Sequence, residues 1–452
     1  MTKSELIISV SGLRGIVGDS LTADVANRLG KAYASHLSVK DTLIIGGDTR
    51  QSFSMLKKAL IKGILSTGVS VIDIGQCPTP TVQQAIRYHQ AAGGMVITAS
   101  HNPIEWNGIK LMNHDGAFLI GKNYDHTFEL FHQQNFRQVD QKDFGTTIID
   151  KQAIQRHITH IFKHLDISSI QSSKLRVLID VNHGAGAIAD PLLFDQLGVD
   201  YEIMYPEADG NFSHTPEPLK QNLSAIIQRL EQESFDIGFV QDPDADRLVI
   251  LAGNGTYIGE DYSLAYCIDY LLQHLNNNEA KQVVVNLSTS KVIEFIAKKH
   301  QANLHYSKIG EPNVTALLQK TGSQVGGEGN GGVIFPKVGW GRDSLLGMVV
   351  ALKHLAESKR SVLDTVTNYP QFFMYRDKIQ LQNKSDISNF LQTIQSKIPA
   401  KSIDTQDGVK LDFGDAWLHV RASNTEPIVR LFAEATSIKQ AKLLVWQAKD
   451  LL

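Results

Sequence analysis

The stretch L-I-I-G-G-D-T-R, residues 43–50, is an apolar run that ends in two glycines and a charged turn. The segment after it repeats apolar residues at helical spacing, at Met55, Leu56, Leu60, Ile61 and Ile64. A β-rich run, a polar turn and an amphipathic helix in this order form one α/β unit. The stretch therefore predicts a strand followed by a helix that packs on it.

The same order of features occurs twice more. R-V-L-I-D-V-N-H-G-A-G (176–186) precedes a segment that closes at Leu197-Gly198, where glycine is typical of a helix C-terminus. V-V-V-N-L-S-T-S (283–290) is followed by the helical pattern K-V-I-E-F-I-A-K-K-H. Identity among the three segments is low, so the predicted repetition is one of shape.

The last part of the chain has a different pattern. A β-rich run at 372–379, an amphipathic stretch near 386–398, two alternating strands and a final helix indicate an α+β domain. A length of 452 residues also favours three or four domains. We predict four, at 1–150, 151–254, 255–365 and 366–452.

Composition excludes several classes of protein. A net charge of −3 argues against a nucleic-acid binder or a polybasic membrane surface. The two cysteines, Cys77 and Cys267, indicate neither a disulfide framework nor a zinc cluster. No secretion signal is recognisable, and no apolar stretch reaches the roughly 18 residues that span a bilayer. We expect a cytoplasmic protein with no nucleic-acid or membrane partner.

A serine loop follows the apolar run in M-V-I-T-A-S-H-N-P (95–103), which places the Ser100 hydroxyl at a strand end, where α/β proteins carry their chemistry. An ordinary turn is the alternative. The G-x-S-x-G elbow of hydrolases is absent. His101 directly follows Ser100, and neighbours in extended chain point opposite ways, so a serine–base pair between them is unfavourable.

An aspartate loop ends the apolar run of F-D-I-G-F-V-Q-D-P-D-A-D-R (235–247). Asp242, Asp244 and Asp246 alternate, and extended backbone would aim all three the same way. Converging carboxylates repel unless a cation lies among them, and oxygen ligands suit Mg²⁺ or Ca²⁺, with a phosphate oxygen completing the shell. An EF-hand is excluded, because its sixth and twelfth positions hold Arg247 and Gly253. A solvated acidic turn is the alternative.

A glycine-rich loop, G-G-E-G-N-G-G (326–332), contains G-x-G-x-x-G, but V-I-F-P follows where a dinucleotide fingerprint requires a helix. Glu328 and Asn330 could instead bind a polyhydroxy ligand, against the alternative of a plain turn.

Basic residues mark three further segments. R-A-S-N-T-E-P (421–427), with Arg430 after it, suits a phosphate dianion, although it is also rich in turn formers. Arg14 and Lys110 stand alone in glycine-bounded segments, where a surface position is the alternative.

These motifs, in the order T-A-S-H-N-P, D-x-D-x-D-R, G-E-x-x-G and R-x-S-N-T-E-P, resemble the alpha-D-phosphohexomutase family over the whole chain. The resemblance implies a four-domain α/β architecture, in which three similar mixed α/β domains and a C-terminal α+β domain surround a central cleft.

The resemblance also implies residue roles. Ser100 would be the phosphoserine, and its phosphoryl oxygen would hold Mg²⁺ together with Asp242, Asp244 and Asp246. The hydroxyls of the sugar would contact Glu328 and Asn330. The phosphate that does not react would be bound by Arg421, Ser423, Asn424, Thr425 and Arg430. The reacting phosphate would be lined by Arg14, His101, Arg247 and Lys110, with Lys110 transferring the proton.

The implied activity is a phosphohexose mutase of the isomerase class, with hexose 1,6-bisphosphate as intermediate and activator. Two departures from the family pattern are Pro243, where glycine is common, and G-E-G-N-G-G in place of G-E-x-S-G-H. The second is similar to archaeal-type phosphoglucosamine mutases and favours glucosamine phosphate. A phosphomannomutase/phosphoglucomutase is the alternative. A sugar-phosphate phosphatase and an inactive sugar-phosphate binding protein are more distant ones, and the oligomeric state stays open.

Overall fold

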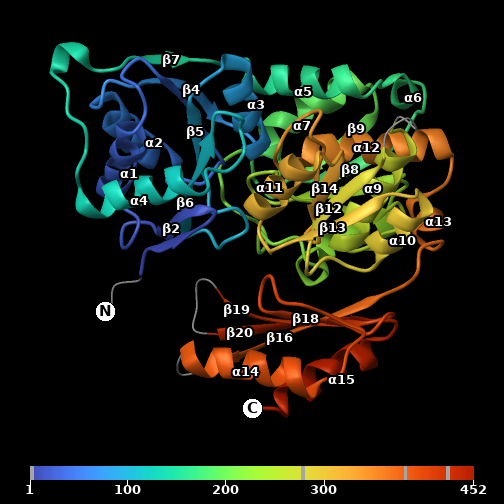
Figure 1. Cartoon of the computed structure of the whole chain (residues 1–452). Helices are drawn as coiled ribbons and strands as arrows, with labels where there is room; N and C mark the ends of the chain where they lie inside the picture. The colour runs from blue at the N-terminus through green and yellow to red at the C-terminus, as the bar shows by residue number, and fades with distance from the viewer. Residues whose placement is uncertain (1–4, 276–279, 381–383, 424–427) are drawn as a thin grey trace. The chain divides into compact units, whose positions relative to one another are not determined.

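The computed structural model describes residues 5–275, 280–380, 384–423 and 428–452 (Figure 1). The chain divides into two compact units, Met1–Ser263 with Asn330–Leu363, and Leu264–Gly329 with Asp364–Leu452. Two helices contain the points where the chain passes from the first unit to the second, α9 (Glu260–Gln273) and α13 (Val362–Val366).

The first unit begins with a seven-stranded mixed sheet in the order β1-β2-β6-β5-β3-β4-β7. Its strands are β1 (Ile7–Ser9), β2 (Gly12–Ile16), β3 (Thr42–Gly47), β4 (Ser70–Gln76), β5 (Gly93–Ile97), β6 (Trp106–Asn113) and β7 (Thr147–Ile149). Strands β3, β4, β5 and β7 are parallel, whereas β6 is antiparallel to β5 and to β2.

Helices cover both faces of this sheet (Figure 1). One face packs on α1 (Ala23–Ser35), α2 (Phe53–Leu65) and α4 (Lys122–Gln133), and the other on α3 (Thr79–His89). Alternate residues of β3 point to opposite faces of the sheet. Leu43 and Ile45 lie in the core beneath α1, α2 and α4, and Ile44 lies in the core beneath α3. The strand and helix predicted from residue 43 onward are β3 and α2.

A second sheet of the first unit has the order β11-β10-β8-β9. Its strands are β8 (Arg176–Asp180), β9 (Asp200–Met204), β10 (Ile237–Gln241) and β11 (Leu248–Ala252). The unit also holds α5 (Ala153–His164), α6 (Ser168–Gln171), α7 (Gly186–Leu197), α8 (Ser224–Gln232), β15 (Gly332–Ile334) and α12 (Ser344–Ser358). Gly198 ends α7 in the left-handed conformation, at φ 65°, which confirms the predicted glycine cap.

The second unit contains a parallel and an antiparallel sheet. The parallel strands are β12 (Gln282–Asn286), β13 (Asn303–Ser307) and β14 (Val325–Glu328), with helices α10 (Val292–Lys299) and α11 (Glu311–Thr321). The antiparallel sheet, in the order β16-β20-β19-β18-β17, comprises β16 (Phe373–Gln380), β17 (Ser402–Asp404), β18 (Val409–Asp412), β19 (Trp417–Ala422) and β20 (Ile428–Ala435). Its core includes residues of α14 (Lys384–Lys397) and α15 (Ile438–Lys449).

One strand arrangement occurs three times, as β4-β3-β5, β9-β8-β10 and β13-β12-β14. In each triplet the strand that comes first in the chain is central, and all three strands are parallel. Together with the antiparallel C-terminal sheet, this confirms the predicted class of three similar α/β folds and one α+β fold. The three predicted domain boundaries stay predictions.

Among the described residues, no helix combines the length and hydrophobicity needed to cross a bilayer.

Helices α1 and α2 cross at two glycines that leave no room for a side chain. A β-carbon on Gly63 would overlap the backbone oxygen of Asn27, and one on Gly30 would lie 2.6 Å from the backbone oxygen of Leu60. We expect Gly63→Ala to destabilise the protein by about 1–3 kcal/mol through overpacking. Alanine is intrinsically favoured over glycine in a helix by about 1 kcal/mol, so a loss must come from this contact.

Urea denaturation would measure the change. Ser54→Ala, on the exposed side of α2, is the matched control and should leave the unfolding free energy within about 0.5 kcal/mol of the wild type. Equal stability of Gly63→Ala and the control would contradict the close crossing.

Candidate active site

Ser100 lies in the loop that follows β5, at a strand end as predicted, and it adopts φ 51°. A left-handed backbone is uncommon for a residue other than glycine and often marks a functional site. The Ser100 Oγ donates a hydrogen bond to Asp242 Oδ2 at 2.8 Å and lies 3.3 Å from His101 Nδ1. The sequence argument against a Ser100–His101 contact is therefore wrong, because it assumed an extended backbone.

Arg50 holds the serine loop from inside the protein. The guanidinium, 1% exposed, donates to four backbone oxygens, those of Ser100, Asn102 and Pro103 in the loop and of Trp106 at the start of β6, at 2.6–2.9 Å. Its Nε bonds to the buried Asp48 at 3.3 Å. Because a guanidinium presents several donors in a fixed plane, this single side chain fixes the path of the loop.

Asp48 extends this scaffold to the other side of Ser100. Its Oδ2 accepts a hydrogen bond of 2.6 Å from Thr98 Oγ1, which in turn accepts one of 2.8 Å from the Ser100 N–H. Burial is the main cause that raises the pKa of Asp48, and Arg50 opposes this rise. The conformation of Ser100 is thus fixed by buried polar contacts.

Asp242, Asp244 and Asp246 converge in the loop between β10 and β11, and one oxygen from each lies within 4.8 Å of the others. The three carboxylates converge as predicted, but the backbone of residues 242–246 is not extended as predicted. The loop is a turn in which the Ala245 N–H bonds to the Asp242 carbonyl and Ala245 adopts φ 52°. The turn, rather than the alternation of a strand, brings the carboxylates together.

Positive and polar groups from distant segments meet these carboxylates. Lys110 Nζ, on β6, donates to Asp244 Oδ2 at 2.7 Å and to Asp246 Oδ2 at 3.1 Å. Arg342 also donates to Asp246 Oδ2, at 2.8 Å, and Thr79 Oγ1 donates to Asp244 Oδ2 at 2.6 Å. The cluster therefore connects β6, the start of α3 and the segment before α12.

The electrostatic environment of the three carboxyl groups differs. Burial, followed by repulsion from Asp244 and Asp246, raises the pKa of Asp242 well above its ordinary value. Burial also opposes ionisation of Asp246, but Arg342, Lys110 and Arg247 outweigh it and hold its pKa below the usual range. Asp244, with Lys110 and Thr79 beside it, likewise has a lowered pKa although burial acts to raise it.

The cluster fits a hard cation. The oxygens Asp244 Oδ1 and Asp246 Oδ1 are buried and have no hydrogen-bond partner among the described residues. Unpaired buried carboxylate oxygens are costly, and oxygen-only donors suit Mg²⁺ or Ca²⁺.

The other predicted residues of the reacting region also lie near Ser100 and the carboxylates. Arg14 donates to Asn102 Oδ1 at 2.9 Å, in the serine loop. The Arg247 N–H donates to Asp242 Oδ1 at 3.0 Å, and its Nε lies 3.9 Å from Asp242 Oδ2. Burial, then Arg247 and Arg14, lower the pKa of His101 well below its ordinary value. The structure thus brings Arg14, His101, Lys110 and Arg247 together with the serine and the aspartates.

Glu328 is the last residue of β14. Strands β5, β10 and β14 are equivalent, because each is the third strand in chain order of its parallel triplet. Its Oε1 accepts hydrogen bonds from Asn286 Nδ2 at 2.8 Å and from the Gly310 N–H at 3.0 Å. Asn330 belongs to the first unit, and its buried Oδ1 has no partner among the described residues. A strand, β15, follows the glycines, which confirms that no dinucleotide fingerprint is present.

Arg421 and Arg430 are direct cross-strand neighbours on β19 and β20. Like charges in this position repel, and a bound anion would relieve the repulsion. Arg421 Nε donates to Asp407 Oδ1 at 3.2 Å, and the Ser423 N–H donates to the Ile428 carbonyl at 2.8 Å. The predicted residues Asn424 and Thr425 lie outside the described part of the chain.

Several residues that contact the predicted site residues, directly or through one another and each within its own unit, were not themselves predicted from sequence. They are Asp48, Arg50, Thr79, Thr98, Arg342 and Asp407. Asp48 and Arg50 follow β3 in the same way that Ser100 follows β5, and this polar strand end was an available signal. Nothing local marks Arg342 or Thr79, whose partners lie more than 90 residues away in sequence.

We expect Arg50→Lys to loosen the serine loop, because an ammonium cannot donate to four carbonyl oxygens in one plane. The unfolding free energy should fall by about 3 kcal/mol through unsatisfied buried groups. Amide hydrogen exchange in residues 98–106 should accelerate more than elsewhere in the first sheet. Arg28→Lys, which alters the i,i+4 ion pair of a partly buried arginine with the exposed Asp24 on α1, is the matched control. Unchanged exchange in the loop would contradict the scaffold role.

Comparisons with known proteins agree with this geometry. Four family descriptions match successive parts of the chain: phosphoglucomutase/phosphomannomutase alpha/beta/alpha domains I, II and III at residues 6–138, 155–255 and 259–372, and the C-terminal domain at 378–450.

Relatives match over nearly the whole length. A phosphoglucomutase/phosphomannomutase of Thermococcus kodakarensis is 34% identical, covering 95% of each chain. A phosphoglucosamine/phosphogalactosamine mutase of Sulfurisphaera tokodaii is 29% identical, covering 99% of each. The crystal structure of a phosphoglucomutase/phosphomannomutase family protein from Burkholderia thailandensis superposes with a TM-score of 0.84 at 26% identity, covering 99% of this chain and 98% of that one. The chain therefore belongs to the phosphoglucomutase/phosphomannomutase family, and it is a phosphohexomutase, an enzyme of the isomerase class.

Proposed function

We propose that this phosphohexomutase moves a phosphoryl group between the 1 and 6 positions of a hexose through phosphorylated Ser100. The observation that carries the proposal is the 2.8 Å hydrogen bond from Ser100 Oγ to Asp242, at the edge of a buried cluster of carboxylates and cations. Enzymatic phosphoryl transfer depends mainly on positioning and charge neutralisation. The hydrogen bonds of Arg50, Asp48 and Thr98 around Ser100 support positioning, and the cluster of carboxylates and cations supports charge neutralisation.

Two transfers complete the proposed reaction. Phospho-Ser100 gives its phosphoryl group to the free hydroxyl of a hexose phosphate. The bond from phosphorus to Oγ breaks, a bond to the sugar oxygen forms, and the hydroxyl proton passes to the protein. The hexose 1,6-bisphosphate then turns over and returns its other phosphoryl group to Ser100 Oγ. The bond from that phosphorus to the sugar oxygen breaks, a bond to Oγ forms, and the sugar oxygen takes back the proton. Lys110 and His101 are the proposed proton carriers, since both lie beside the groups that react.

Asp242, Asp244 and Asp246 are proposed to hold Mg²⁺ together with a phosphoryl oxygen. The two unpartnered carboxylate oxygens support this assignment. When bound, Mg²⁺ supplies positive charge that stabilises the transferring phosphoryl group. Arg14 and Arg247 are the proposed cationic partners of the same phosphate.

Further residues are proposed to bind the parts of the substrate that do not react. Glu328 and Asn330 would bind sugar hydroxyls, and the unpartnered Asn330 oxygen is an acceptor suited to this. The facing pair Arg421 and Arg430, with Ser423, Asn424 and Thr425, would bind the phosphate that does not react.

Glucosamine 6-phosphate is the proposed substrate because of the G-E-G-N-G-G loop. Glucose and mannose phosphates are the second candidates, since the Thermococcus relative is named a phosphoglucomutase/phosphomannomutase.

We expect Ser100→Ala to lower mutase turnover by about a thousandfold or more, because the group that carries the phosphate is lost. The assay supplies Mg²⁺ and a trace of hexose 1,6-bisphosphate, and follows glucosamine, glucose and mannose 6-phosphates to their 1-phosphates. Ser54→Ala is the control. The ranking of kcat/KM among the three sugars tests the substrate assignment. Free phosphate as the main product would indicate a phosphatase instead, and unchanged isomerisation in Ser100→Ala would overturn the mechanism.

Metal binding is tested separately from turnover. Mg²⁺ should raise the midpoint of thermal unfolding by a few degrees relative to EDTA, because a ligand that binds only the folded state stabilises it. Asp244→Asn should remove this shift and lower turnover by about a hundredfold or more. Asp200→Asn, at an exposed position, should keep both. A shift of the same size in Asp244→Asn would place the cation elsewhere.

A further inference from the structure

A cavity of about 460 Å³ lies in the first unit, lined by residues of α3 and α5. Arg87 and Tyr88 of α3 and Arg156, His160 and Lys163 of α5 are among its lining residues. None of the residues proposed for the mutase reaction lines it. A volume of this size is within the range of small-molecule sites.

The lining of this cavity is positively charged. Arg87, Arg156 and Lys163 belong to it, and no carboxylate does. Arg156 forms an ion pair with Asp150 outside the lining, and Arg87 donates to the Val338 carbonyl at 2.6 Å. Within the described part of the chain, the Lys163 ammonium has no hydrogen-bond or ion-pair partner. The lining therefore has an excess of positive charge, which favours an anion.

Two buried nitrogen atoms of the lining also have no hydrogen-bond partner among the described residues, His160 Nε2 and Arg156 Nε. Buried polar atoms normally have a partner in protein or ligand. Burial, then the neighbours His164 and Arg87, lower the pKa of His160. A ligand with hydrogen-bonding groups would satisfy these atoms.

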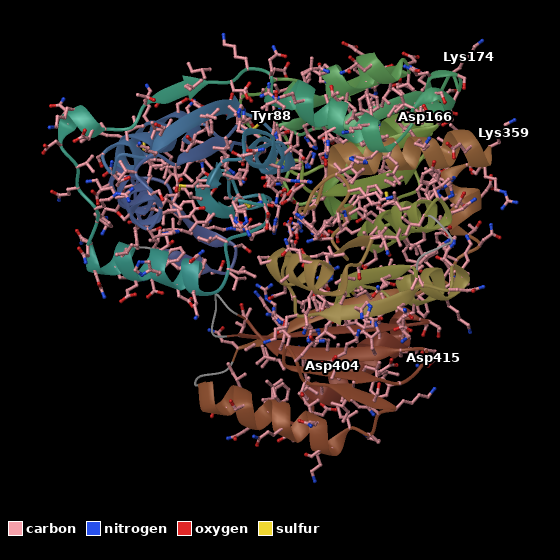
Figure 2. All side chains as sticks on the ribbon, turned by 45° about the horizontal axis from the view of Figure 1, so that its top comes forward. Tyr88, Asp166, Lys174, Lys359, Asp404 and Asp415 are labelled. Carbon is pink, nitrogen blue, oxygen red and sulfur yellow. The ribbon has the colours of Figure 1, made fainter. Side chains whose placement is uncertain are left out.

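Tyr88, labelled in Figure 2, supplies an aromatic surface. Its side chain is 63% exposed, and the Arg156 guanidinium lies 4.3 Å from its ring centroid. An arginine stacked on a tyrosine forms a flat platform, and nucleobases stack on both kinds of side chain.

We propose that this cavity is a second ligand site, separate from the mutase site, and that it binds a nucleoside monophosphate. The phosphate is bound by Lys163 and Arg87, and the base lies against Tyr88 and Arg156. A nucleoside monophosphate has a planar base that can stack on Tyr88 and Arg156, and a phosphate that can pair with Lys163. A planar ring without a phosphate would leave Lys163 unpaired, and an anion without a ring would leave the aromatic surface uncovered.

Isothermal titration of the full chain with adenosine and uridine monophosphates tests the proposal. The titrations contain saturating hexose 6-phosphate, which occupies the mutase site. We expect at least one nucleotide to bind with a Kd below about 1 mM, and adenosine, uridine and inorganic phosphate to bind at least about tenfold more weakly. Lys163→Ala should weaken nucleotide binding about tenfold, as loss of a charged hydrogen bond does. Tyr88→Ala should weaken it as well.

Lys40→Ala, at an exposed position in the same unit, is the control and should bind as the wild type does. Mutase activity in the absence of nucleotide should be unchanged in all three variants, which shows that they are folded. The proposal is overturned if neither nucleotide binds, if inorganic phosphate binds as tightly as the nucleotides, or if Lys163→Ala has no effect on binding. Nucleotide binding that occurs only when hexose 6-phosphate is left out would assign the nucleotide to the mutase site and would also overturn the proposal.

Discussion

Mutual repulsion among three buried carboxylates is the constraint on which the first unit depends. Two unit charges about 4 Å apart repel by about 4 kcal/mol at an effective dielectric constant near 20, so Asp242, Asp244 and Asp246 cannot converge without compensation. The compensating groups are Lys110 on β6, Arg342 before α12 and Thr79 at the start of α3. Because these come from separate elements, the packing of both sheets of the unit is linked to the charge balance of one loop.

The repeated strand triplet explains where three of the candidate site residues are located. Ser100 follows β5, Asp242 follows β10 and Glu328 ends β14, and each of these strands is the third of its triplet in chain order. The carboxyl ends of parallel strands are where α/β folds leave room for ligands. The loops after β5, β10 and β14 therefore occupy equivalent positions in their three sheets. The side chains of the three loops differ.

Much of this could be predicted from the sequence, because strand ends are marked locally by apolar runs followed by polar residues. The positions of Ser100 and of the three aspartates follow from that pattern. The left-handed conformations of Ser100 and Ala245 could not be predicted, since neither residue is a glycine and the strain is balanced by distant contacts. For the same reason the Ser100–His101 contact was missed. Arg342 and Thr79 were missed because only the folded chain brings them to Asp246 and Asp244.

Helix α3 is anchored at both ends. Its first residue, Thr79, bonds to the aspartate loop through both backbone and side chain, and Arg87 in its last turn bonds to the Val338 carbonyl. Eleven residues make a rod of about 16 Å, and each residue added or removed would turn one end relative to the other by about 100°. Neither anchor could follow such a rotation. An insertion or deletion within α3 would therefore separate one of these two anchors from its partner.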